Sequence, residues 1–98
     1  MVYKIDFSGD AREHLNLYPK RDQVALVEHI ERKLLDQPCL EARNRKRLKP
    51  NKLATLELRI GAFRVYFDVD VEAQVVIIVA IGKKEHAKVI IAGEEVQL

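Results

Sequence analysis

Residues Leu56 to Asp68 read LELRIGAFRVYFD, and this stretch decides the fold. Apolar and polar residues alternate on both sides of Gly61-Ala62, which is typical of two strands joined by a hairpin turn. Glycine at the first central position suits a tight two-residue turn that matches the twist of the strands. We therefore expect strands over 54–60 and 63–70.

This turn also predicts which residues face each other across the hairpin. The expected pairs are Ile60–Phe63, Arg59–Arg64, Glu57–Tyr66 and Thr55–Asp68. One face is apolar and should pack under helices: Leu56, Leu58, Ile60, Phe63, Val65, Phe67 and Val69. The opposite face carries the remaining residues: Thr55, Glu57, Arg59, Arg64, Tyr66 and Asp68.

Before the hairpin, the pattern predicts one strand and two helices. Val2 to Phe7 alternates as a strand does, and Ser8 or Asp10 can cap a short helix over 10–17. A longer helix is expected over 22–36, between Pro19 and Pro38, with an apolar stripe of Val24, Val27, Ile30 and Leu34.

After the hairpin, residues 74–81 are nearly all apolar, as in a central strand covered on both faces, and Gly82 should end it. Residues 89–92 suggest a short edge strand. The prediction is one α+β domain over 1–98. An N-terminal strand and two helices precede an antiparallel three-strand meander, with the helices packed on one face of one sheet. The expected core comprises Val27, Ile30, Phe63, Val65, Phe67, Ile77 and Val79.

The composition is that of a globular protein with a local basic segment. The net charge is +2, from 17 basic and 15 acidic residues. Six basic residues and no acid lie between positions 43 and 52: Arg43, Arg45, Lys46, Arg47, Lys49 and Lys52. Local basic charge is the usual footprint of an anionic partner, although a solvated loop is the simpler alternative.

Other features exclude several classes of function. Cys39 is the single cysteine, and the three histidines are far apart, so neither an internal disulfide nor a metal site is expected. No signal peptide is recognisable, and the longest apolar run, Val75 to Ile81, is too short to span a bilayer. We expect a cytoplasmic protein without a cofactor.

Two arginines face each other in the expected hairpin register. Like charges directly opposite in a sheet repel, and Glu57 lies diagonally from Arg64, where it could relieve part of that repulsion. Either these residues form a solvated charge ladder, or Arg59 and Arg64 await a phosphate. Lys83, Lys84 and His86 follow the central strand and could reach the same face.

The hairpin, together with residues 75–86, resembles the RelE/ParE superfamily of bacterial toxins. The order of elements and the chain length are also similar. The resemblance implies the toxin of a type II toxin–antitoxin pair, which is cytoplasmic and held inactive in a hetero-oligomer with an antitoxin. RelE-like members cut messenger RNA in the ribosomal A site without a metal, whereas ParE-like members poison DNA gyrase.

The resemblance also implies roles for individual residues. Arg64 matches the family's phosphate-binding hairpin arginine, and Lys84 matches a position that is commonly arginine. Where nuclease members carry lysines and a tail tyrosine, this chain has Thr55, Glu57 and Ile90. If the chain cuts RNA, Glu57 or His86 is the expected acid or base. The expected phosphate-binding residues are Arg59, Arg45, Lys46, Arg47, Lys49, Lys52 and Lys83.

Three functions remain open from the sequence. The first is a ribosome-dependent endonuclease that inhibits translation, the second a gyrase inhibitor, and the third a non-toxic module that binds an antitoxin and represses their operon. All three imply an acidic, partly disordered antitoxin that covers the Arg59/Arg64 face, the basic segment or the helices.

Overall fold

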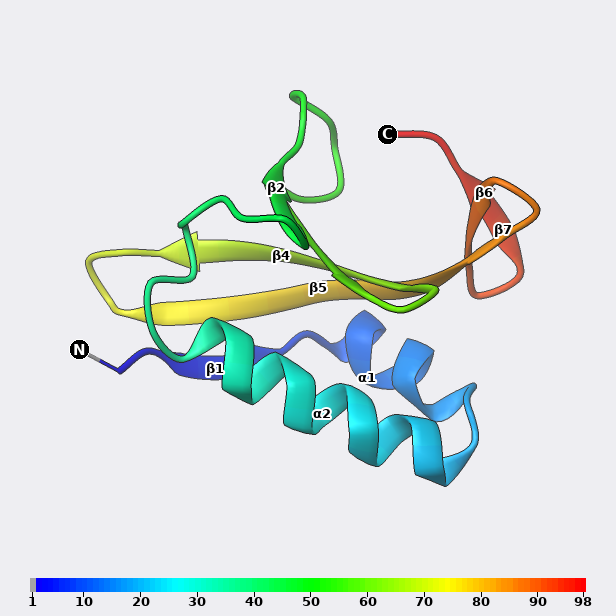
Figure 1. Cartoon of the computed structure of the whole chain (residues 1–98), viewed down its shortest axis with the longest axis horizontal. Coiled ribbons are helices and arrows are strands. Elements are labelled where there is room, and N and C mark those ends of the chain that lie inside the picture. Colours follow the sequence, from blue (N-terminus) through cyan, green and yellow to red (C-terminus); the bar gives the residue numbers. More distant parts are fainter. Residues whose placement is uncertain (1) are drawn as a thin grey trace.

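A twisted sheet carries two helices on one side (Figure 1). The computed structural model describes residues 2–98. Its elements, in chain order, are β1 (Lys4–Phe7), α1 (Gly9–Asn16), α2 (Lys20–Leu34), β2 (Arg45–Arg47), β3 (Leu56–Ile60), β4 (Phe63–Asp70), β5 (Val75–Glu85), β6 (Lys88–Ile91) and β7 (Glu94–Val96). The expected α+β class, with both helices on one face, is confirmed.

The sheet is larger than the predicted meander. Within the described residues it has seven strands, ordered β2-β3-β4-β5-β6-β7, and β1 pairs in parallel with β5. After β1, the chain crosses one face of the sheet through α1 and α2 and re-enters the sheet at the opposite edge as β2. The following strands then lead back across the sheet, so that β5 lies beside β1 and parallel to it. β2, inside the basic segment, and β7 were not predicted, because three-residue strands leave too short a pattern to recognise.

The hairpin has the predicted register. Ile60 lies opposite Phe63, Arg59 opposite Arg64, and Glu57 opposite Tyr66. Gly61 has φ +58°, a conformation that is easy only for glycine at the first position of this turn. The next pair is linked through side chains, because Thr55 donates both its backbone N–H and its hydroxyl to Asp68 Oδ1 at 2.8 Å.

The two helices cover a core formed by alternate residues of β3, β4 and β5. Ser8 caps α1, as predicted, by accepting a hydrogen bond from the Ala11 N–H. α2 begins at Lys20 rather than at 22, and its buried stripe is Leu26, Ile30 and Leu34. The expected place of Val24 in that stripe is wrong, since Val24 is 48% exposed. No helix in residues 2–98 has the length and apolar character needed to cross a membrane.

β5 departs most from the sequence prediction. It does not end at Gly82 but continues to Glu85. The pairing of β4 with β5 shifts by one residue between Tyr66 and Phe67, which leaves Val79 as the extra residue of a bulge. The helix side of β5 therefore carries the buried residues Val76, Ile78 and Ile81, whereas the expected core residues Ile77 and Val79 are only half-buried.

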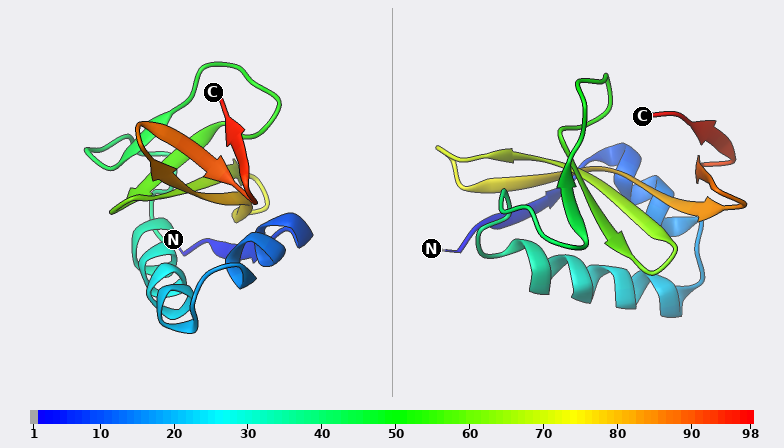
Figure 2. Two further views of the ribbon diagram at one scale, coloured as in Figure 1. Left: turned by 90° about the vertical axis from the view of Figure 1, so that its right-hand side faces the viewer. Right: turned by 45° about the horizontal axis from the view of Figure 1, so that its top comes forward.

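The face opposite the helices holds a second, smaller apolar cluster. Its buried members are Ala54, Tyr66, Ala80 and Ile91. The segment that joins β2 to β3 and the β6–β7 pair both rise on this side of the sheet (Figure 2). β6 can approach because Gly82 has no side chain, since a Cβ there would lie 2.6 Å from Ile91 Cγ1 and 2.8 Å from the Ile90 carbonyl oxygen.

Candidate functional site

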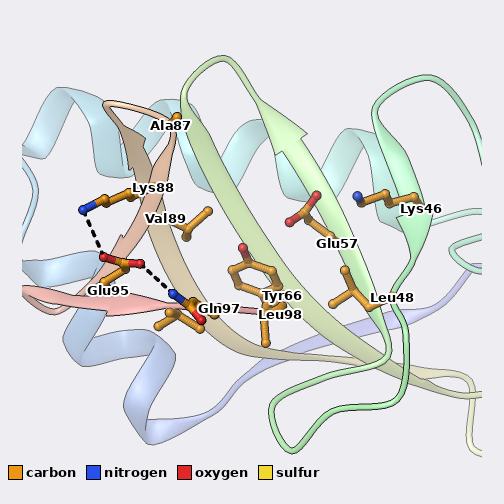
Figure 3. Close-up of a pocket in the computed structure, with 11 residues that line it drawn as sticks. Lys46, Leu48, Glu57, Tyr66, Ala87, Lys88, Val89, Glu95, Gln97 and Leu98 are labelled. Carbon is orange, nitrogen blue, oxygen red and sulfur yellow. Dashed lines mark hydrogen bonds and ion pairs between the residues drawn. The ribbon is translucent and has the colours of Figure 1, made fainter.

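A groove of about 370 Å³ lies between β2 and the β6–β7 pair, on the face opposite the helices. Glu57 and Tyr66, from β3 and β4, lie between its two sides (Figure 3). Lys46 and Leu48 line the β2 side, and Val89 and Val96 line the other. We call this space the central groove. It combines two carboxylates, a phenol, an amide and two lysines with apolar side chains.

Glu57 is nearly buried, with 6% of its surface exposed. Its Oε1 accepts a hydrogen bond from Arg59 Nε at 3.2 Å, and Tyr66 lies directly opposite Glu57 on the neighbouring strand. A buried carboxylate needs such partners, because burial without them favours its neutral form. The sequence suggested Glu57 as acid or base, and the structure places it in the central groove.

Tyr66 is the least exposed polar residue of the central groove, at 1%. Burial raises the pKa of Tyr66 far above that of a free tyrosine. The negative charge of Glu57 and its hydrogen bond raise this pKa further, whereas Arg64 and Arg59 lower it. The Tyr66 hydroxyl therefore stays protonated, which leaves it a hydrogen to donate on the side of the Glu57 carboxylate.

Arg64 is buried beside the hairpin turn and has backbone partners. Its Nη1 donates to the carbonyl oxygens of Gly61 and Phe63, both at 2.9 Å. The predicted repulsion between Arg59 and Arg64 is relieved because Arg59 pairs with Glu57 and Arg64 binds these carbonyls. The expected relief of Arg64 by Glu57 is thus replaced by a pair between Glu57 and Arg59. Arg64 supports the turn, and its remaining N–H groups are the ones a phosphate would use.

The basic segment does not act as one surface. Arg45 Nη1 donates to the Lys33 carbonyl oxygen at 2.7 Å, at the C-terminal end of α2, so this arginine lies outside the central groove. Arg47, two residues along the same strand, shares the Arg45 side of the sheet. Lys46 alone of these three lines the groove. Lys49 and Lys52 are exposed on the segment that rises above the sheet (Figure 2).

The bulge in β5 decides which side of the sheet each of the following lysines faces. Lys83 Nζ lies 5.3 Å from the centre of the Phe63 ring, which packs edge-on against Tyr18 at 5.0 Å. Lys83 is therefore on the helix side, and the expectation that it reaches the hairpin's polar face is wrong. Lys84 pairs with Val89 and is exposed. His86 is exposed at the β5–β6 turn, next to the groove residue Ala87.

At two positions where this chain lacks the residues of RelE-like nucleases, Thr55 and Ile90, the structure shows what the side chain does instead. Thr55 is committed to Asp68 at the start of the hairpin. Ile90 pairs with Lys83 and shares its side of the sheet, whereas Val89 lines the groove. A tyrosine at position 90 would therefore not point into the central groove from β6 as this strand lies here.

Comparisons with known proteins give structural relatives only. No protein-family model matches the chain, and neither does any curated protein. A chain of the toxin–antitoxin complex RelBE2 from Mycobacterium tuberculosis is 28% identical, with a TM-score of 0.74 over 85% of this chain and 92% of that one. A mutant of the E. coli toxin RelE in the free state is 26% identical, with a TM-score of 0.65 over 87% of this chain and 86% of that one.

The chain has the fold of RelE-like toxins. A chain of the archaeal RelE–RelB complex from Pyrococcus horikoshii OT3 has the same fold at 19% identity, with a TM-score of 0.70 over 89% of this chain and all of that one. The predicted resemblance and fold are thereby confirmed. None of these similarities assigns a role to a residue of the central groove.

The RelE-like chain also has groove residues that sequence reasoning did not assign. Tyr66 was placed opposite Glu57 by the hairpin register, but nothing in the pattern indicated that its hydroxyl would bind the carboxylate. Lys88 and Glu95, which form an ion pair of 3.5 Å, come from strands with almost no sequence signal. Among residues 2–98, no three His, Cys, Asp or Glu side chains are grouped to hold a metal ion.

Proposed function

We propose that this RelE-like chain is the toxin of a type II toxin–antitoxin pair and that it cleaves messenger RNA on the ribosome. The observation that carries the proposal is the nearly buried Glu57 carboxylate, held by Tyr66 and Arg59 between the two sides of a groove. A carboxylate fixed in this groove can accept a proton, which is the first requirement for cutting RNA without a metal.

The reaction needs three groups. Glu57 takes the proton of a ribose 2′-hydroxyl, and that oxygen bonds to the adjacent phosphorus. The bond from phosphorus to the 5′-oxygen breaks, and this oxygen leaves with a proton from an acid, for which His86 is the candidate beside the groove. Cations stabilise the charge that gathers on the phosphate. The products are a 2′,3′-cyclic phosphate and a 5′-hydroxyl end.

The cations near Glu57 are unequal in their availability. Lys46 lies opposite Glu57 across β2 and β3, and it has no ion pair with another residue in 2–98. Lys88 is paired with Glu95, so a phosphate that binds Lys88 has to compete with that carboxylate. Arg59 is half-exposed and can turn toward a phosphate. Lys49 and Lys52 extend positive charge along the rising segment, where they can follow the RNA backbone.

An antitoxin is the expected regulator of this activity in the cytoplasm. Two of the similar structures are complexes, RelBE2 and RelE–RelB. We propose an acidic partner because Lys46, Lys49 and Lys52, with the half-exposed Arg59, supply positive charge on the groove face. A partner on this face would exclude RNA by occupying the same cations.

A translation extract with one defined messenger tests the proposal. The protein is added with and without translating ribosomes, and the new 5′ ends of the RNA are mapped. Codon-phased cuts that require ribosomes support the endonuclease. Uncut RNA together with trapped gyrase–DNA complexes in a parallel assay would replace it with a gyrase inhibitor. Uncut RNA, unaffected gyrase and normal growth on expression would indicate a non-toxic antitoxin-binding module.

A further inference from the structure

Tyr66 joins the second apolar cluster to the central groove. Its ring is buried with Ala54, Ala80 and Ile91, and the partly buried Leu48 and Val89 pack against the same cluster. Its hydroxyl lies in the groove, on the side of its cross-strand partner Glu57 (Figure 3). The ring is thus fixed from several elements, while its single polar atom reaches the residue proposed as the base.

Glu57 needs a rigid partner to act at one defined place. A glutamate side chain has three rotatable bonds, and its carboxylate can turn freely unless hydrogen bonds hold it. Arg59 binds one oxygen, but its own side chain is 46% exposed, so the arginine end of the pair is free to move. Tyr66, at 1% exposure, is the immobile partner of the two.

We propose that Tyr66 is a positioning residue, whose hydroxyl holds the Glu57 carboxylate in the orientation that accepts the substrate's proton. This inference rests on the proposed nuclease function, and neither the family resemblance nor the similar structures assign this role to position 66. Fixing a reacting group in a productive geometry is worth large factors in rate, so loss of one such contact should lower the rate of the chemical step.

The hydroxyl is suited to this role because it remains a donor. The pKa of Tyr66 is raised by burial and by Glu57, so the group stays protonated through the range in which a cytoplasmic enzyme works. A water molecule in its place would give Glu57 a hydrogen bond without a fixed direction. The alternative is that Tyr66 only fills the second apolar cluster, in which case a phenyl ring would serve equally well.

The test compares Tyr66→Phe with Tyr18→Phe. Both variants lose one phenolic hydroxyl, but Tyr18 lies on the helix side against Phe63, away from the groove. Cleavage of messenger RNA in ribosome complexes is measured as kcat and KM across pH. We expect Tyr66→Phe to lower kcat by on the order of tenfold or more with little change in KM, and to alter the pH profile, while Tyr18→Phe matches the wild type. An unchanged kcat and pH profile in a folded Tyr66→Phe protein would overturn the inference.

A second measurement does not depend on activity. Side-chain NMR relaxation of Glu57 reports directly how firmly the carboxylate is held. Increased Glu57 mobility in Tyr66→Phe, with none in Tyr18→Phe, supports positioning even if the wild type fails to cut RNA, in which case the proposed nuclease alone is refuted. Equal Glu57 mobility in all three proteins would contradict the positioning role itself.

Discussion

Arg45 and Lys46 are consecutive residues of β2 whose side chains serve opposite faces of the sheet. Arg45 binds the Lys33 carbonyl oxygen at the end of α2, whereas Lys46 lines the central groove opposite Glu57. The two cations of one basic segment thus have separate tasks. One links the edge strand to a helix end, where a cation also interacts favourably with the helix dipole, and the other remains free for an anion.

Alanine substitution should separate these tasks. Arg45→Ala should lower the free energy of unfolding by about 1 kcal/mol, since a hydrogen bond from a charged donor to a helix-end carbonyl is lost, and leave the cleavage rate near that of the wild type. Lys46→Ala should leave stability within about 0.5 kcal/mol and weaken RNA binding, most strongly at low salt. Urea unfolding and RNA binding at two salt concentrations measure both effects.

Lys4→Ala is the matched control for the lysine. Lys4, on β1, has a largely exposed side chain that forms a 3.8 Å ion pair with Asp6. Its removal should change neither stability nor binding. If Lys4→Ala weakened RNA binding as much as Lys46→Ala does, binding would depend on net charge alone. The proposal that RNA binds in the central groove would then be refuted.

Gly82→Ala tests the close packing of β6 over β5. The added methyl group would meet Ile91 and the Ile90 carbonyl oxygen at less than normal contact distance. We expect about 1–3 kcal/mol of destabilisation or a displaced β6–β7 pair, because overpacking forces neighbours to move. Gly9→Ala is the control. Gly9 lies in α1, and nothing lies within 4 Å of where its Cβ would be. This substitution should therefore raise the free energy of unfolding by about 0.5–1 kcal/mol. Equal urea midpoints for the two variants would refute the close approach.

The Tyr66 hydroxyl should make stability depend on alkaline pH. The pKa of Tyr66 is raised in the folded protein, so its contribution is fully present below the unfolded tyrosine pKa of about 10 and is lost as pH rises above it. At neutral pH, Tyr66→Phe should cost about 1 kcal/mol for the lost hydrogen bond. This gap in unfolding free energy should narrow as the pH is raised above about 10. If the difference in unfolding free energy between the two proteins widened with pH, the pKa of Tyr66 would be lower in the folded protein than in the unfolded one.

The hairpin was the most predictable part of the molecule. Gly61 sets the turn, and strict alternation from Leu56 to Phe67 then determines both the register and the face of every residue. Glu57, Arg59 and Tyr66 were placed on one face for that reason. What the pattern could not show is that Tyr66 is buried there, because its cover comes from β6, β7 and the segment before β3.

The faces of β5 could not be predicted for a physical reason. Residues 75–81 are apolar throughout, so no alternation reveals a bulge at Val79. The bulge reverses the side on which the following residues lie, and it sends Lys83 to Phe63 rather than to the hairpin's polar face. β2 was missed for a related reason, since no turn of fixed length sets its register against β3. Arg45 and Lys46 were therefore expected to act together.

Replacement of Glu57 by glutamine removes the proposed base and leaves the shape of its side chain unchanged. Glutamine keeps the size and the hydrogen-bonding capacity of the side chain but cannot accept the proton of the 2′-hydroxyl. Glu72→Gln makes the same change in the exposed β4–β5 turn and is the control. The quantity to measure is the single-turnover rate of messenger cleavage in ribosome complexes. The account predicts that Glu57→Gln slows cleavage by about 10²–10⁴-fold while Glu72→Gln does not. A Glu57→Gln protein that cuts as fast as the wild type would contradict it.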